Sequence, residues 1–263
     1  MTWRDLLDPE SSSHKRFKNM RSFLCEATVW LLQPLSGSST HDISPWMSWH
    51  GRLMVLSWGL LLPLGVLVAR FFKVMPGQDW PRMLDNKLWW KVHLHGQSWA
   101  LALALVGMGL VWGQAAGANA LARCHGLLGW TVMGLGALQA LVGFARGSKG
   151  GPTDVALRGD HYDMTALRKG FERIHKALGY LALLLACTAL GLGLVVADAP
   201  RWMVLGLGLW WLALAATFGW LQAWKRCIDT YQAIWGPDPR HPGNQMKPIG
   251  WGIHRPDRFT KAT

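Results

Sequence analysis

Charged residues are scarce in this chain, and the common motifs of soluble enzymes are missing. Asp, Glu, Lys and Arg make up 16% of the 263 residues, whereas soluble domains average about 25%. The four cysteines form no C-x-x-C pair, and no C-x-x-C-H motif for covalent haem attachment occurs. There is no Walker-type or G-x-G-x-x-G loop and no H-E-x-x-H motif. The usual signatures of zinc, nucleotide and metalloprotease sites are therefore absent.

Long uncharged apolar stretches take the place of the missing charges. Apolar runs of about 20 residues are typical of transmembrane helices, since at 1.5 Å per residue they cross a hydrocarbon core of ~30 Å. We expect an all-α integral membrane protein with five transmembrane helices, the first starting near Trp46. The uncharged stretches are Leu53 to Ala69, Gly96 to Ala122, Gly126 to Ala145, Ala177 to Ala197 and Trp202 to Trp224.

Three regions follow from this pattern. Residues 44–224 are expected to form the transmembrane domain, and Pro63 inside the first span predicts a local kink. Residues 1–43 are polar, with an apolar patch from Phe23 to Leu35 that is too short to span and favours an interfacial or partner-binding helix. Residues 225–263 form a basic tail rich in Pro and Gly, which we expect to lie along the membrane surface without a core of its own.

The net charge of +12 favours a lipid partner over a nucleic acid. In a soluble chain this charge would indicate nucleic-acid binding, but here the basic residues cluster in loops beside the spans. Anionic lipid headgroups and membrane topology explain that placement better. The excess of Lys and Arg on one side predicts a cytoplasmic C-terminus and an N-terminus on the opposite, periplasmic side.

Four histidines near the starts of consecutive spans carry the functional hypothesis. An ionisable residue inside a membrane is costly and marks a functional site by default. Because successive helices alternate in direction, His50 and His125 share one side of the membrane, and His93 and His175 share the other. A haem iron with two axial imidazoles takes one from each of two facing helices. The spacing therefore predicts two b haems, held by His50/His125 and His93/His175, with irons roughly 20 Å apart.

Glycines accompany two of these histidines. His125 and His175 share the pattern H-x-x-L-G-aromatic, which places Gly129 and Gly179 one helical turn away on the same face. A missing side chain there lets a flat macrocycle lie against the backbone. We expect the stripe of glycines that begins at Gly129 to continue along the same helix through Gly136 and Gly143, where the second haem would pass.

Two assignments stay open: which histidine of the second span is the ligand, and what the arginines at the span ends do. His93 and His95 lie about 200° apart on a helix, and Gln97 shares the face of His93, which favours His93 as the ligand. Arg52 and Arg123 each lie two residues from a predicted ligand. They are candidates for pairing with haem propionates, with anchoring at the membrane interface as the alternative.

These residues resemble the cytochrome b561 family, in the five-helix form found beside DOMON domains and as bacterial stand-alone proteins. The resemblance covers about residues 46–222, and the first 45 residues are too few for a DOMON domain. It implies two b haems in a four-helix core, in a protein of the bacterial inner membrane. The motifs are His50-Gly-Arg-Leu-Met, Trp89-Trp-Lys-Val-His93, His125-x-x-Leu-Gly129 and Phe171-x-x-x-His175-x-x-x-Gly179-Tyr180.

We therefore expect transmembrane electron transfer through two b haems. As a transmembrane oxidoreductase, the protein would take electrons from a quinol, ascorbate or a redox partner protein. A haem-bearing or structural subunit that anchors a larger membrane complex is the alternative, and a haem-free transporter is a third class. The resemblance implies basic residues at the cytoplasmic haem of members that react with ascorbate. Arg168, Lys169, Arg173 and Lys176 match, but positive-inside topology alone also accounts for them.

Overall fold

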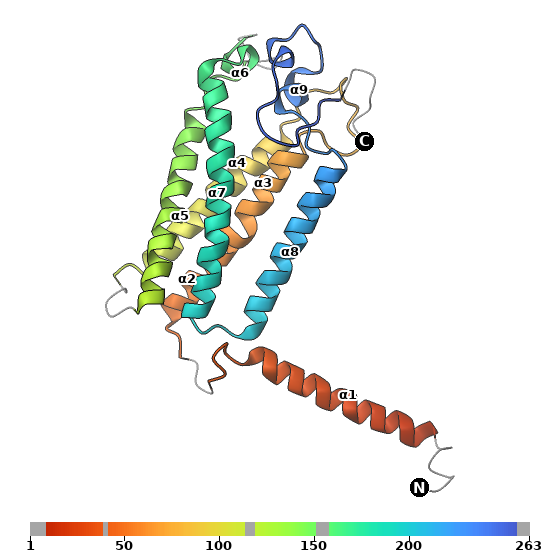
Figure 1. Ribbon diagram of the computed structural model, residues 1–263, viewed down its shortest axis with the longest axis vertical. Helices are drawn as coiled ribbons and strands as arrows, with labels where there is room; N and C mark the ends of the chain where they lie inside the picture. Colours follow the sequence, from red (N-terminus) through yellow and green to blue (C-terminus); the bar gives the residue numbers. More distant parts are fainter. Residues whose placement is uncertain (1–8, 39–41, 114–118, 151–157, 257–263) are drawn as a thin grey trace.

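The protein is all-helical in a computed structural model that describes residues 9–38, 42–113, 119–150 and 158–256. Within these ranges the chain forms helices and two isolated β-bridges, without a strand. Figure 1 shows a long bundle, with α1 leaving at one end and the C-terminal segment folded over the other. The elements are α1 (Pro9–Leu32), α2 (Pro45–Met54), the π-helix η2 (Val55–Leu61), α3 (Leu62–Phe71), α4 (Leu88–Leu110), α5 (Ala120–Phe144), α6 (Asp160–Asp163), α7 (Ala166–Val196), α8 (Arg201–Ala223), α9 (Thr230–Trp235) and the 3-10 helix η3 (Pro242–Gln245).

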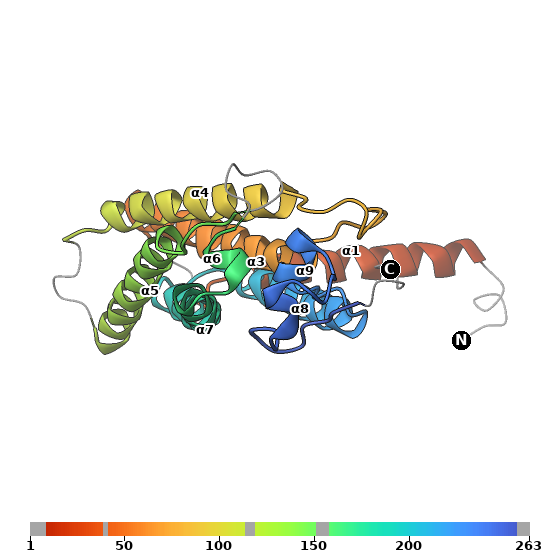
Figure 2. The ribbon, with the colours of Figure 1, turned by 90° about the horizontal axis from the view of Figure 1, so that it is seen from above.

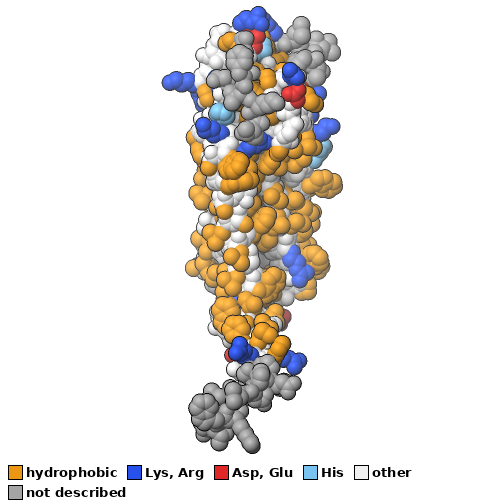
Figure 3. Space-filling model, turned by 90° about the vertical axis from the view of Figure 1, so that its right-hand side faces the viewer, with side chains coloured by type: hydrophobic (Ala, Val, Ile, Leu, Met, Phe, Trp, Pro, Cys, Tyr) orange, Lys and Arg blue, Asp and Glu red, His pale blue; other side chains and the backbone are white. Residues whose placement is uncertain are grey.

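Four helical segments among the described residues are long and apolar enough to cross a membrane: Pro45–Phe71 (α2, η2 and α3 together), α5, α7 and α8. Helix α4 has 23 residues, but His93, His95 and Gln97 in its first half lower its mean hydropathy. Figure 3 shows hydrophobic side chains over the middle of the bundle, while most Lys and Arg side chains lie toward its ends. The chain is an integral multi-pass membrane protein, as expected, and the fifth span stays a prediction.

Small side chains occupy the centre of the bundle. Ala100 and Ala104 of α4 and Ala182 and Ala186 of α7 are all buried, in one core cluster with Trp58 of η2. Helix α4 packs along α2, η2 and α3, and α5 packs along α7 (Figure 2). Small residues let membrane helices approach closely, so this packing sets the distances between the helices that carry the histidines.

The irregularity expected at Pro63 takes the form of the π-helix η2, which ends just before it. Proline has no N–H to donate to the carbonyl four residues earlier, which here is that of Gly59. The indole Nε1 of Trp210 on α8 donates to this oxygen instead, at 2.8 Å. The break in the helical ladder is thereby compensated by a neighbouring span, as membrane helices require.

Three segments far apart in the sequence fold together over one end of the bundle. We call residues 72–87, 158–165 and 226–256 the cap. Lys176 of α7 ties the cap to the bundle by donating to the Ile249 carbonyl at 2.6 Å. Arg70 of α3 makes a second connection, with its guanidinium 4.2 Å from the centre of the Trp251 ring.

The C-terminal tail contributes a core of its own to the cap, where the sequence predicted a tail without one. Tyr231, Ile234 and Trp235 are buried against Met164, and Ile228 is buried against residues of the 72–87 loop. The Pro and Gly content of the tail suits its turns. Its apolar residues pack against one another and against segments that are distant along the chain, so composition alone does not reveal the core.

Helix α1 is longer than the apolar patch from Phe23 to Leu35 that the sequence shows. It begins at Pro9 and ends at Leu32, and it projects sideways from the bundle (Figures 1 and 2). A turn after it pairs Pro34 with Pro200 at the start of α8. Its use as an interfacial helix stays a prediction.

Candidate functional site

The four histidines lie in two pairs at opposite ends of the bundle. The ring centres of His50 on α2 and His125 on α5 are 6.2 Å apart, with the rings nearly perpendicular at 87°. Those of His93 on α4 and His175 on α7 are also 6.2 Å apart, at 80°. His93 contacts the backbone of α3 near its start, whereas His50 contacts α4 near its end, so helical rise separates the pairs by roughly 20 Å.

Backbone carbonyls orient three of the four rings through Nδ1. His50 Nδ1 lies 2.9 Å from the Gly107 carbonyl oxygen, His93 Nδ1 lies 3.1 Å from that of Gly65, and His125 Nδ1 lies 3.1 Å from that of Ala189. A ring that donates its Nδ1 proton to a carbonyl keeps the lone pair of Nε2 for a metal. Gly107 lies in the last turn of α4, where carbonyls lack intrahelical partners, so His50 satisfies an otherwise orphaned acceptor.

His175 is held differently from the other three. Its Nδ1 is buried, and no hydrogen-bond partner for it exists among the described residues. The ring of Phe171, one turn earlier on α7, stacks on it with centres 5.2 Å apart and planes at 26°. Packing therefore fixes this ring, and the Gln139 amide donates to the His175 carbonyl at 3.1 Å.

The ring separation fits a metal ion between each pair. A metal–imidazole bond of about 2 Å on each side, and about 1 Å from each nitrogen to its ring centre, give roughly 6 Å between centres. A direct hydrogen bond between the rings would bring the centres to about 5 Å. The observed 6.2 Å thus matches bis-imidazole coordination better than a histidine–histidine hydrogen bond.

The glycines at the site divide into two kinds. A Cβ at Gly129 would meet no other atom within 4 Å, and one at Gly179 would meet only Gln139, at 3.9 Å. Both positions leave room for a flat group beside a ligand. A Cβ at Gly136 would instead lie 2.8 Å from Leu101, so this glycine serves close helix packing, contrary to the expectation that it continues the stripe.

Comparison with known proteins identifies the family of this chain. A family described as eukaryotic cytochrome b561 matches residues 49–199, a range that includes all four histidines. The chain belongs to the cytochrome b561 family. It is accordingly a membrane protein of electron transport, with haem b as its cofactor.

Curated relatives share the cytochrome b561 region within longer chains. A cytochrome b561, DM13 and DOMON domain-containing protein of Arabidopsis thaliana is 26% identical over 80% of this chain and 22% of its own length. Ferric-chelate reductase 1 of Bos taurus is 31% identical over 55% of this chain and 22% of its own length. A cytochrome b561 and DOMON domain-containing protein of Arabidopsis thaliana is 28% identical over 57% of this chain and 34% of its own length. The chain thus spans about a fifth to a third of these relatives. No solved structure matches it.

The remaining predicted residues of this cytochrome b561 chain lie around the pairs. Gln97 donates to the Leu62 carbonyl at 3.1 Å and braces α4 against α3. His95 is exposed, whereas His93 faces His175. Arg52 is exposed and stacks 5.1 Å from the centre of the Trp49 ring, an arrangement typical of interfacial anchoring, and Arg123 is exposed at the start of α5.

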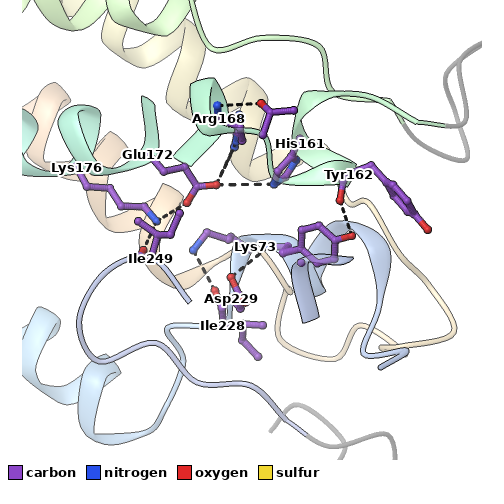
Figure 4. Close-up of polar contacts among 12 residues, drawn as sticks. Lys73, His161, Tyr162, Arg168, Glu172, Lys176, Ile228, Asp229 and Ile249 are labelled. Carbon is purple, nitrogen blue, oxygen red and sulfur yellow. Dashed lines mark hydrogen bonds and ion pairs between the residues drawn. The ribbon is translucent and has the colours of Figure 1, made fainter. Parts of the chain in front are cut away.

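A buried ion network lies one turn from His175, at the junction with the cap (Figure 4). Glu172 is 7% exposed and accepts from Arg168 at 3.2 Å and from Lys176 at 2.7 Å. His161 Nε2 lies 3.8 Å from the same carboxylate. Burial, followed by the charge of Arg168, lowers the pKa of His161 to about 3. His161 is therefore neutral at pH 7, and its contact with Glu172 is not an ion pair there.

The sequence does not reveal Gly193, which contacts a predicted ligand directly. A Cβ at this position would lie 3.0 Å from Cε1 of His125, closer than nearly all real contacts of a Cβ. The absence of a side chain on α7 is what allows the His125 ring to reach the Ala189 carbonyl. Its only signal in the sequence is a second glycine two residues earlier, Gly191, within an apolar run.

Proposed function

We propose that this protein carries electrons across a membrane through two b haems, one ligated by His93 and His175 and the other by His50 and His125. The observation that carries the proposal is the 6.2 Å ring separation found in both pairs. We propose five spans. The fifth is α4, whose polar first half makes it less apolar than a typical membrane-spanning helix. The four helices that bear histidines form the haem-binding core.

The chain's own residues supply ligation, orientation and exclusion of water. When bound, each haem provides an iron that takes up and releases one electron reversibly. The four Nε2 atoms are the ligands, and the carbonyls of Gly65, Gly107 and Ala189 hold three of the rings in place. The alanine-rich core between the pairs keeps water from the middle of the bundle. Gly129 and Gly179 give the macrocycles room beside the helices.

The proposed setting is the bacterial inner membrane, with the C-terminus and the cap on the cytoplasmic side and the N-terminus outside. The excess of Lys and Arg on the cap side supports this orientation. The proposed donors are a quinol, ascorbate or a redox protein. The name ferric-chelate reductase, carried by a relative, adds ferric chelates as an acceptor class to be tested.

Electron transfer across a sealed membrane tests the proposal. Haem-loaded protein in liposomes that enclose ferricyanide or a ferric chelate should reduce the trapped acceptor when ascorbate or a quinol is added outside. His93→Ala and His125→Ala should each reduce the rate to that of protein-free liposomes, because each interrupts the path at one end. Haem-loaded wild type that is no faster than protein-free liposomes would overturn the proposal in favour of a subunit that anchors a larger complex.

A further inference from the structure

In the part of the chain that the structure describes, helix α1 is joined to the bundle near its C-terminal end. It contacts α8, where Arg201 at the start of that helix meets Gln33 and Trp30, and the rest of α1 runs away from the bundle (Figures 1 and 2). A helix of 24 residues that leaves a membrane bundle sideways has three environments open to it: water, another protein, or the membrane surface. The attachment, the exposed side chains and the charge decide among these.

The attachment fixes the level at which α1 leaves the bundle. The Leu35 N–H donates to the Ala199 carbonyl at 3.2 Å, in the turn between the apolar helices α7 and α8. Arg201, the first residue of α8, donates to the Gln33 amide oxygen at 2.9 Å, and its guanidinium lies 4.8 Å from the centre of the Trp30 ring. Helix α7 ends and α8 begins at this turn, so the C-terminal end of α1 lies at the boundary between membrane and water.

One face of α1 is apolar and uncovered. Phe17, Met20 and Leu24 are 62%, 50% and 55% exposed, and their spacing places them along a single stripe. Ala27 and Leu31 continue the stripe toward the bundle and are partly buried. A stripe of this kind exposed to water would be unfavourable, since contiguous exposed apolar surface marks a site of contact.

The charge of α1 indicates the chemistry of that contact. Arg16, Lys18 and Arg21 are exposed, and the only acidic side chain between residues 16 and 32 is Glu26, which accepts from Ser22 at 2.9 Å. Lys18, Ser22 and Glu26 lie on the face opposite the apolar stripe. A helix with an apolar stripe, basic residues and a tryptophan near its anchored end has the features of helices that lie in the headgroup layer of anionic membranes.

We propose that α1 binds the surface of an anionic phospholipid bilayer, with its apolar stripe at the acyl boundary and its basic residues among the phosphates. The attachment at the end of two spans is what favours lipid over a protein partner. The helix is already held at the membrane surface, and burying the stripe requires no other molecule. Each basic residue near an anionic surface strengthens binding about fivefold.

Spin labels on the two faces of α1 test the proposal in the full chain. Labels are attached at Leu24→Cys on the stripe and at Ser22→Cys on the opposite face, with Met20→Cys as a second stripe position. The background carries Cys25→Ser, Cys124→Ser and Cys187→Ala, while Cys227, which is 1% exposed, is retained. The protein is placed in nanodiscs of phosphatidylcholine containing about one-third phosphatidylglycerol. Collision rates with oxygen, which enriches in acyl chains, and with a water-soluble nickel complex are then compared.

The ratio of oxygen to nickel collisions should be several-fold higher at Leu24→Cys and Met20→Cys than at Ser22→Cys. Arg16→Gln, Lys18→Gln and Arg21→Gln together should lower the ratio at the stripe, as should high salt, since both weaken attraction to anionic headgroups. Equal nickel access on both faces would show that α1 lies in water and would overturn the proposal. Protection of the stripe from oxygen and nickel alike would overturn it in favour of a protein partner or a second copy of the chain.

Discussion

The two ends of the bundle hold equally spaced histidine pairs in different surroundings. Both pairs have ring centres 6.2 Å apart, and carbonyls orient both rings of the His50/His125 pair. The His93/His175 pair lies beside the cap and the buried network of Glu172 with its two basic partners. Helix packing thus sets the ligand geometry, while the surroundings differ in charge and in access to water.

This difference predicts different reduction potentials for the two haems. The network of Arg168, Glu172 and Lys176 carries one net positive charge, and a positive environment favours the state that has gained an electron. The arginines at the other end, Arg52 and Arg123, are exposed and therefore screened by water and salt. We expect the haem at His93/His175 to have the higher potential.

The largest effect should come from a substitution that removes the haem at one end of the bundle and leaves the other haem in place. Gly193→Val places a side chain where a Cβ already lies 3.0 Å from His125, so the ring must move away from the Ala189 carbonyl. We expect the variant to retain about one haem of the two, measured as pyridine haemochrome per chain. Gly191→Val is the matched control, because a Cβ there meets nothing within 4 Å. Equal haem content in both variants would contradict the assigned contact.

Acid should destabilise the cap, where His161 is buried. The folded pKa of His161 is about 3, against 6.5 for the free side chain, so between these values the unfolded cap binds more protons than the folded cap. The cap therefore loses about 1.4 kcal/mol of stability per pH unit as the pH falls from about 6.5 toward 3. The loss of stability is measured by hydrogen exchange of the amides of α9 in the cap, corrected for intrinsic rates. The amides of α2, at the opposite end of the bundle, serve for comparison.

His161→Phe is the control for the acid effect. The ring of His161 lies 5.8 Å from that of Tyr231 and 6.4 Å from that of Trp235, so a phenyl group fits the same aromatic surroundings without titrating. The variant should lose most of the pH dependence of exchange in α9. An unchanged pH dependence would assign the acid effect to another group.

The smallest effect should come from changing one charge near one pair. Glu172→Gln leaves Arg168 and Lys176 without their anion, and the added positive charge should raise the potential of the haem at His93/His175 by on the order of 50 mV. The other haem should keep its potential. Redox titration followed by optical spectroscopy resolves the two, with Glu26→Gln on the exposed surface of α1 as the control. An equal shift of both potentials would remove the proposed difference between the ends.

The sequence was sufficient to predict the all-helical membrane fold and to direct attention to the four histidines. Both inferences depend on local properties, namely long apolar runs and polar residues within them. Apolar runs alone do not mark α4 as a span, because His93, His95 and Gln97 lower the hydropathy of its first half.

What the sequence did not reveal depends on contacts between distant segments. The cap core brings Ile228 and Tyr231 against residues more than 60 positions earlier in the chain, and no local pattern in a Pro/Gly-rich tail encodes that. The sequence also does not reveal Gly193 or the carbonyls that accept from the histidines. A glycine or a backbone oxygen has such a role only through its contact with a residue on a neighbouring helix. Gly136 was predicted to lie beside a haem but lies at a contact between helices. The sequence alone does not distinguish these two roles of a glycine.

Haem stoichiometry with single ligands removed tests the central claim most directly. Haem per chain is measured in the wild type, in His93→Ala, in His125→Ala, in the double variant and in His95→Ala. We expect two haems in the wild type and in His95→Ala, one in each of the other single variants, and none in the double variant. One haem in the wild type, or loss of a haem in His95→Ala but not in His93→Ala, would contradict the central claim.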